Sequence, residues 1–295
     1  MSPPVRTAVI PAGGLGTRFL PFSRTVPKEL LPLVDVPVID FVLSECAAAG
    51  IERVVLVGAP GKEALREYFR PNERVAARLE RDGRHAELAL ARRPEGLAEV
   101  VWVVQEAPLG NGHAVLVARD AVGNEPFALV WGDDVIRSEV PAIAQLERVR
   151  QARGGSVAGA MKIAREQSGR YGMFSGTAVD ERTLRVQSVV EKPAPADAPG
   201  DLASVHGYVL DPAIFDVLAD CQPGRGGEIW LADAVSTLAA RSPVWAVELE
   251  GTRYDAGERS GYVAAFVDEA LARADTGPAL REHLRRAGWR EPGGR

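Results

Sequence analysis

A short apolar segment that runs directly into a glycine-rich loop is the feature that most constrains this chain. Residues 7–11 (TAVIP) have the composition of a buried strand, and residues 12–18 (AGGLGTR) follow at once. Glycines allow backbone N–H groups to surround a phosphate closely, because no Cβ stands in the way. The loop carries Arg18, and Lys28 follows shortly after it. We therefore interpret the segment as a polyphosphate-binding loop and expect a nucleoside triphosphate as its ligand.

The spacing of the glycines excludes two common phosphate-binding loops. No Gly-Lys-Ser/Thr follows at the spacing of a Walker A loop. Gly14 and Gly16 form a G-x-G, but the next residues supply no third glycine, so the dinucleotide-binding fingerprint is incomplete. A glycine-rich turn without a ligand is the alternative interpretation, and the two nearby cations argue against it.

Predicted strands and helices alternate through the first half of the chain. Apolar runs bounded by turn residues predict strands at residues 7–11, 53–57, 100–105, 126–131 and 156–162. Helices are predicted between them, at residues 38–49, 62–69, 112–119 and 140–153, with a surface helical insertion at 72–93. This alternation is typical of an α/β fold with a mostly parallel sheet and helices on both faces.

The second half of the chain has shorter segments. Residues 172–192 predict a hairpin, and further strands are expected at 205–210, 244–249 and 252–254. Helices are expected at 228–240, 259–273 and 278–286, and residues 290–295 are expected to be disordered. No sharp boundary separates the halves, so we predict one composite domain over residues 1–295.

Composition and charge limit the possible functions. The 295 residues carry a formal net charge of −5, which argues against a general nucleic-acid-binding surface. Cys46 and Cys221 form no C-x-x-C pair, so neither a disulfide framework nor a zinc site is expected. The sequence has no signal-peptide pattern and no apolar run of membrane-spanning length, and we therefore expect a cytoplasmic protein without a membrane partner.

Several motifs in a fixed order make the chain resemble the sugar-1-phosphate nucleotidyltransferase family, with the bacterial UTP–glucose-1-phosphate uridylyltransferases as the nearest group. The motifs are residues 8–11 (AVIP), 14–18 (GLGTR), 27–35 (PKELLPLVD), 110–116 (GNGHAVL), 190–193 (VEKP), 228–229 (EI) and 254–257 (YDAG). The resemblance implies a Rossmann-like nucleotide-diphospho-sugar transferase fold with a mixed central sheet, a requirement for Mg²⁺ and release of pyrophosphate. It also implies a nucleotide-binding half at about residues 7–160, a sugar-binding half at about 161–255, C-terminal helices at about 256–290, and a homodimer or homotetramer.

The reaction of that family requires cations rather than a general base. An oxygen of a sugar 1-phosphate attacks the α-phosphorus of a nucleoside triphosphate, and pyrophosphate leaves. Because the nucleophile is already an anion, the protein has to align two anions and neutralise the charge that develops. The four histidines form no Ser-His-Asp arrangement, as this chemistry leads us to expect.

The resemblance assigns three cations to the phosphates. It implies that Arg18 holds the outgoing pyrophosphate, that Lys28 steadies the triphosphate and that Lys192 holds the sugar phosphate. A solvated surface cation is the alternative interpretation of any lone arginine or lysine. The motif around each residue favours a function here.

Two carboxylates are implied to bind Mg²⁺, Asp133 and Asp255. Asp133 follows a predicted strand, where ligands bind in open α/β sheets. Carboxylate and phosphate oxygens are the ligands that Mg²⁺ prefers. For the neighbouring Asp134, capping of the following segment is the alternative to a metal-binding role.

The resemblance also implies two groups of substrate-binding residues. The nucleotide group is Ala12, Gly13, Gly14, Gly16, Thr17, Gln105 and Gly110. The Gln105 amide suits a pyrimidine edge because it offers both a donor and an acceptor, and His113 is interpreted as a helix-start residue. The sugar group is Gly172, Glu191 and Lys192. Neighbouring strand residues point to opposite faces, so the last two share a site only if the chain kinks before Pro193.

The chain departs from the usual uridylyltransferase pattern at a few positions, namely Arg24, Val36, His206, Trp230, Glu258 and Arg259. Most of them lie in the later half, which handles the sugar and the subunit contacts in the family. UTP and glucose 1-phosphate are the expected substrates. The alternatives are dTTP, another hexose or a cyclitol 1-phosphate, and a non-catalytic nucleotide-sugar sensor, against which the retained phosphate and metal residues argue.

Overall fold

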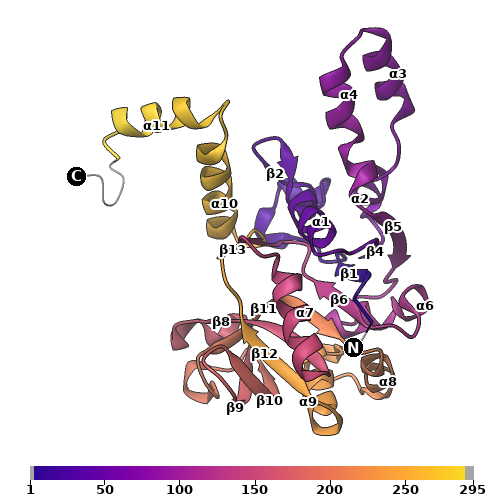
Figure 1. The fold of residues 1–295 in the computed structure, drawn as a ribbon, viewed down its shortest axis with the longest axis vertical. Coiled ribbons are helices and arrows are strands. Elements are labelled where there is room, and N and C mark those ends of the chain that lie inside the picture. Colours follow the sequence, from indigo (N-terminus) through magenta and orange to yellow (C-terminus); the bar gives the residue numbers. More distant parts are fainter. Residues whose placement is uncertain (1–2, 290–295) are drawn as a thin grey trace.

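The structure, a computed structural model, describes residues 3–289, and a nine-stranded mixed sheet forms its centre (Figure 1). In spatial order its strands are β5 (Glu99–Val104), β4 (Arg53–Gly58), β1 (Thr7–Pro11), β6 (Phe127–Val130), β11 (Leu202–Leu210), β8 (Ser156–Lys162), β12 (Val244–Glu248), β10 (Thr183–Glu191) and β9 (Gly172–Ala178). The expected disorder of residues 290–295 lies outside the described residues.

The parallel part of the sheet comes from the first half of the chain. Strands β5, β4, β1 and β6 run parallel to one another. Strand β11 is antiparallel to both β6 and β8, β12 runs parallel to β8, and β9 and β10 form the predicted hairpin. The carboxyl ends of β5, β4, β1 and β6 therefore meet at one edge of the sheet.

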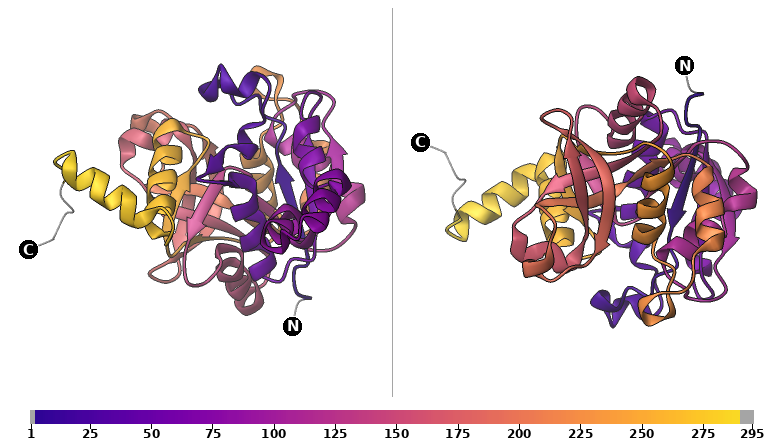
Figure 2. Two further views of the ribbon diagram at one scale, coloured as in Figure 1. Left: turned by 90° about the horizontal axis from the view of Figure 1, so that it is seen from above. Right: turned by 90° about the horizontal axis from the view of Figure 1, so that it is seen from below.

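Helices cover both faces of the sheet, as the alternating pattern predicts (Figure 2). In β1 the side chain of Val9 joins one apolar core, whereas Ala8 and Ile10 join the other, because successive strand residues point to opposite faces. The core around Val9 includes residues of α5 (Asn111–Leu116), α6 (Arg119–Val122), α8 (Ala213–Asp220) and α9 (Leu231–Arg241). The opposite core includes residues of α1 (Val38–Ala48), α2 (Glu63–Tyr68) and α7 (Ala142–Arg153).

Two small sheets and two pairs of helices complete the described chain. The small sheets pair β2 (Pro32–Leu33) with β3 (Val36–Pro37), and β7 (Asp134–Arg137) with β13 (Thr252–Asp255). Helices α3 (Glu73–Arg81) and α4 (His85–Arg92) form the predicted insertion and project from the molecule, and α10 (Arg259–Ala272) leads to α11 (Gly277–Arg286) (Figure 1). Among residues 3–289, no helix has both the length and the apolar composition needed to span a bilayer.

The structure corrects the prediction at several elements, among them the short strands β2 and β3, which were not predicted. The helix predicted to begin at residue 228 begins at Leu231, because the Ile229 N–H donates to the Leu109 carbonyl at 2.7 Å and holds residues 228–230 extended. Strand β7 and helix α8 were not predicted. Strand β7 has only four residues and pairs with a segment far away in the sequence, so it has little local signal.

Candidate active site

The segments that carry the predicted site residues meet at the carboxyl edge of the parallel strands. The glycine-rich loop follows β1, Gln105 follows β5, and Asp133 lies just after β6. A cavity of about 570 Å³ opens there. The predicted residues that line it are Arg18, Asp133, Gly172, Glu191, Lys192 and Asp255.

Residues predicted to contact the base and ribose lie together beside this cavity. The Ala12 N–H donates to the Val57 carbonyl at 2.8 Å. The Gln105 amide donates from Nε2 to the Gly110 carbonyl at 3.0 Å, and a Cβ on Gly13 would lie 3.4 Å from Gln105 Oε1. Gln105 Nε2 also lies 3.0 Å from His113 Nδ1, so this histidine orients the amide from the first turn of α5.

The glycine-rich loop packs directly against the segment that carries Lys28. Gly16 has φ +65°, and a Cβ there would lie 3.2 Å from Lys28 Cβ. Thr17 begins the short 3₁₀ turn Thr17–Phe19, while a Cβ on Gly14 would meet nothing within 4 Å. Glycine suits position 16 because of its positive φ, and a Cβ there would also be in tight contact with Lys28. At position 14, by contrast, the protein leaves room for a side chain.

Two of the departures from the family pattern act on Arg18. Glu258 Oε1 lies 3.0 Å from Arg18 Nε, and Arg259 donates from Nε to the Arg18 carbonyl at 2.6 Å. Both residues stand at the beginning of α10. The beginning of α10 thus contacts the loop that carries the predicted pyrophosphate-binding arginine.

The carboxylates of Asp133 and Asp255 converge because β7 pairs with β13. The register places Asp255 opposite Asp134, and the Ala256 N–H donates to the Asp133 carbonyl at 2.8 Å. A Cβ on Gly257 would lie 2.3 Å from Asp133 Oδ2 and 3.2 Å from Asp255 Oδ1. The two carboxylates therefore face one small space that a side chain at position 257 would fill.

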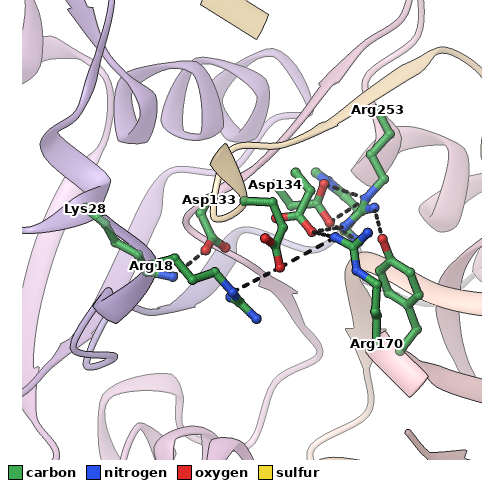
Figure 3. A network of polar contacts seen from close by, with 10 residues as sticks. Arg18, Lys28, Asp133, Asp134, Arg170 and Arg253 are labelled. Carbon is green, nitrogen blue, oxygen red and sulfur yellow. Dashed lines mark hydrogen bonds and ion pairs between the residues drawn. The ribbon is translucent and has the colours of Figure 1, made fainter. Parts of the chain in front are cut away.

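The charges around this space set the protonation of the carboxylates. The Lys28 ammonium is hydrogen-bonded to Asp133 (Figure 3). Burial raises the pKa of Asp133, but Lys28 outweighs burial and holds that pKa below its usual range. Burial, opposed by Arg253 and reinforced by Asp133, raises the pKa of Asp255. A cation placed between the carboxylates would favour the ionised form of both.

Asp134 points away from this space into a structural network. It is 3% exposed, and Arg253 Nε donates to its Oδ1 at 2.7 Å (Figure 3). The backbone N–H of His206 donates to its Oδ2 at 2.8 Å. Asp134, the first residue of β7, thus joins this strand to β13 and β11, and its carboxylate is used there rather than to cap the following segment.

Two arginines at the cavity were missed in the sequence. Arg170 lies 3.5 Å from Glu258 and 3.7 Å from Asp255, and Arg253 donates to the Tyr171 hydroxyl at 3.2 Å (Figure 3). Both line the cavity. Neither belongs to one of the motifs of the sequence, so only the folded chain identifies them.

The residues predicted to hold the sugar come together through the expected kink. Lys192 has φ +47°, directly before Pro193, and its N–H donates to the Tyr171 carbonyl at 3.0 Å. Its Nζ lies 3.4 Å from Glu191 Oε1, and a Cβ on Gly172 would lie 3.2 Å from Glu191 Oε2. Burial raises the pKa of Glu191, and Lys192 opposes this rise.

His206 occupies a position where the resemblance predicts glycine. The backbone conformation at this position is one that glycine adopts readily, which explains the glycine of the family pattern. The φ of His206 is +63°, and the following Gly207 has φ +156°, where a Cβ would lie 1.8 Å from the Leu129 carbonyl oxygen. The fully buried imidazole has Nε2 3.1 Å from a Glu45 carboxylate oxygen. The histidine thus bridges β11 and α1 close to the site.

We expect the contribution of His206 to stability to decrease as the pH rises. Burial lowers its pKa, but Glu45 and Asp134 outweigh burial and raise it above the ordinary 6.5. The contribution is therefore complete below about pH 6.5 and is lost as the pH rises through the folded-state pKa. Each tenfold gain in proton affinity on folding corresponds to about 1.4 kcal/mol of this contribution.

Urea unfolding of the wild type and of His206→Asn measures this dependence, since asparagine tolerates a positive φ. The substitution should lower the free energy of unfolding more at about pH 6 than at about pH 9. An equal loss at both values would contradict the expectation.

Comparisons with known proteins identify the family and the fold. The profile of a family described as nucleotidyl transferase matches residues 7–271. A UTP–glucose-1-phosphate uridylyltransferase of Staphylococcus epidermidis is 37% identical over 281 residues, which cover 95% of this chain and 98% of that protein. Among solved structures, a UDP-glucose pyrophosphorylase complexed with UDP-glucose has a TM-score of 0.83 at 33% identity, covering 91% of this chain and 100% of the other. A UTP-bound UGPase from Acinetobacter baumannii has a TM-score of 0.87 at 29% identity, covering 95% and 99%.

Proposed function

The chain belongs to the nucleotidyl transferase family, and we propose that it transfers UMP from UTP to glucose 1-phosphate with release of pyrophosphate. The single observation that carries the proposal is the arrangement of charge around one cavity. Arg18 and the Lys28–Asp133 pair approach it from the first half of the chain, and Lys192 approaches it from the second half. The names of the relatives supply the two substrates.

The residues around the cavity suit an in-line transfer between two anions. A phosphate oxygen of glucose 1-phosphate forms a bond to the α-phosphorus, and the bond from that phosphorus to the bridging oxygen of pyrophosphate breaks. Lys192 would hold the incoming phosphate, Lys28 would steady the triphosphate, and Arg18 would hold the pyrophosphate that leaves. No proton has to be removed from the nucleophile, so positioning and charge neutralisation supply the rate.

Substrate binding is assigned to the two groups of residues described above. Gln105, held by Gly110 and His113, would read the uracil edge with the remaining acceptor of its amide. Glu191 would accept hydrogen bonds from sugar hydroxyls above Gly172. The nucleotide-binding half thus corresponds to about residues 7–160 and the sugar-binding half to about 161–255.

The carboxylates fit a magnesium ion. Asp133 and Asp255 face one small space, and Gly257 supplies the room between them. Two hard oxygen donors in a site that also receives phosphates suit Mg²⁺. When bound, the ion would neutralise charge on the phosphate oxygens. We also propose that the enzyme works in the cytoplasm, where nucleoside triphosphates are available, and that it forms a homodimer or a homotetramer.

A two-by-two assay tests the proposal. Pyrophosphate release is measured with UTP or dTTP, each combined with glucose 1-phosphate or galactose 1-phosphate, in the presence of Mg²⁺. We expect the highest kcat/KM with UTP and glucose 1-phosphate. A higher kcat/KM with dTTP than with UTP would contradict uracil as the base. Because uracil and thymine differ by one methyl group, we expect kcat/KM for the two nucleotides to differ by no more than about 10-fold to 200-fold. Binding of UDP-glucose without any pyrophosphate release would instead identify a sensor.

A further inference from the structure

We infer that Trp230 is a positioning residue for Lys192, which it holds at the cavity through a cation–π contact. The ammonium nitrogen of Lys192 lies 4.9 Å from the centroid of the Trp230 ring. Contacts within about 6 Å are attractive, and tryptophan is the best aromatic partner for a cation. The kinetic part of the inference rests on the proposed function, whereas the contact itself does not.

Lys192 needs such support because little else restrains its side chain. The side chain is 49% exposed, and Glu191 Oε1 lies 3.4 Å from its Nζ. Ion pairs at this exposure contribute little, and a lysine loses the entropy of a long flexible stem when it is fixed. The backbone turn at φ +47° directs the side chain toward the cavity but leaves its end free to move. The indole face gives that end a preferred position.

Trp230 itself is held from both sides by the loop that contains Gly110. The Ile229 N–H donates to the Leu109 carbonyl at 2.7 Å, and the Gly112 N–H donates to the Ile229 carbonyl at 2.9 Å. On the other side, the Leu231 N–H donates to Asn111 Oδ1 at 2.9 Å. The backbone on both sides of Trp230 is therefore held in place, which positions the base of its side chain beside Lys192.

This close approach depends on two glycines of the same loop. A Cβ on Gly110 would lie 2.7 Å from the Ile229 carbonyl oxygen, and one on Gly112 would lie 2.8 Å from the same atom. The loop that approaches Gln105 through Gly110 thus also fixes the support of Lys192. At position 230 the resemblance predicts glutamine, whose amide has no aromatic face and could not make this contact.

Nuclear magnetic resonance of methylated lysines tests the contact without any substrate. The chain has only four lysines, Lys28, Lys62, Lys162 and Lys192. Reductive methylation with ¹³C-formaldehyde preserves the positive charge, and Lys192→Arg identifies the Lys192 signal. We expect this signal to be shifted upfield by the indole ring current in the wild type, to keep part of the shift in Trp230→Phe, and to lose it in Trp230→Leu. An unchanged signal in Trp230→Leu would overturn the inference.

Steady-state kinetics test the consequence for the reaction. Trp230→Leu should raise KM for glucose 1-phosphate about twofold to fivefold, as expected for loss of an exposed cation–π contact. The KM for UTP should stay unchanged, and Trp230→Phe should restore most of the loss. Equal values of KM for glucose 1-phosphate in Trp230→Leu and the wild type would overturn the positioning role.

Trp245 provides a matched control. Its ring contacts a different cation, Arg185, which lies 4.9 Å from the ring centroid and is not a predicted site residue. Trp245→Leu should therefore change neither the Lys192 signal nor KM for glucose 1-phosphate, and a change equal to that of Trp230→Leu would show a general effect of lost tryptophan. If the wild type released no pyrophosphate from UTP and glucose 1-phosphate, the proposed function would fail, while the methyl signal would still decide the contact.

Discussion

Asp133→Asn should reduce kcat for pyrophosphate release by about a thousandfold or more while the protein stays folded. The substitution removes one of the two carboxylates that face the space beside Gly257, and it removes the charged partner of Lys28. Loss of a metal-binding carboxylate costs several kcal/mol of transition-state stabilisation, and about 4 kcal/mol corresponds to a thousandfold. The effect should fall on kcat and kcat/KM alike, because the interaction is needed in the transition state.

The measurement is steady-state pyrophosphate release over a range of Mg²⁺ concentrations, together with urea unfolding. Asp216→Asn is a matched control, because that carboxylate is 70% exposed and pairs with Arg119 away from the cavity. The control should keep wild-type activity. An Asp133→Asn variant with a kcat within about tenfold of the wild type would contradict the metal assignment.

Lys62→Met should lower the free energy of unfolding by about 3–5 kcal/mol. Lys62 Nζ lies 2.9 Å from Glu29 Oε2, and the two side chains are 8% and 1% exposed. Removal of the ammonium leaves the Glu29 carboxylate buried without its partner, which is the costly case for a buried pair. Because Glu29 follows Lys28 in the chain, we also expect a lower kcat.

A double variant separates the cost of the unpaired charge from a loss of packing. Lys62→Met combined with Glu29→Gln should recover a large part of the stability, since neither charge of this buried pair is then left. Lys162→Met is the matched control, because Lys162 is 58% exposed and water screens its pairing with Glu248, so the loss of stability should be small. Equal losses of stability in Lys62→Met and Lys162→Met would contradict the expectation.

Much of the fold could be predicted because its signals are local. The apolar run at β1 and the glycine-rich loop after it act within a dozen residues, and the structure confirms the strand at Thr7–Pro11. The hairpin of β9 and β10 was predicted from alternating strands and turn residues, and the kink before Pro193 occurs at Lys192. These features depend on backbone sterics and on the alternation of side chains between two faces.

The geometry of the candidate site could be predicted only in part. The motifs identified Lys28 and Asp255, and the end of a predicted strand identified Asp133. The structure brings the three together, while the role of each stays a prediction. Nothing in the motifs indicated Arg170 or Arg253 at the cavity. Single arginines carry no pattern, because their position relative to the site depends on strands that are distant in sequence.

The sequence by itself determined the α/β class, the family and the loop at the end of β1, because these follow from short-range patterns and from motifs in order. The tertiary structure alone decided which charges meet. The β7–β13 register places Asp255 beside Asp133. Lys62 and Glu29 form a buried ion pair. The Leu109–Gly112 segment holds the backbone beside Trp230, whose ring lies under the Lys192 ammonium. Each of these contacts joins segments remote in sequence, so each depends on the packing and hydrogen bonding of the whole chain.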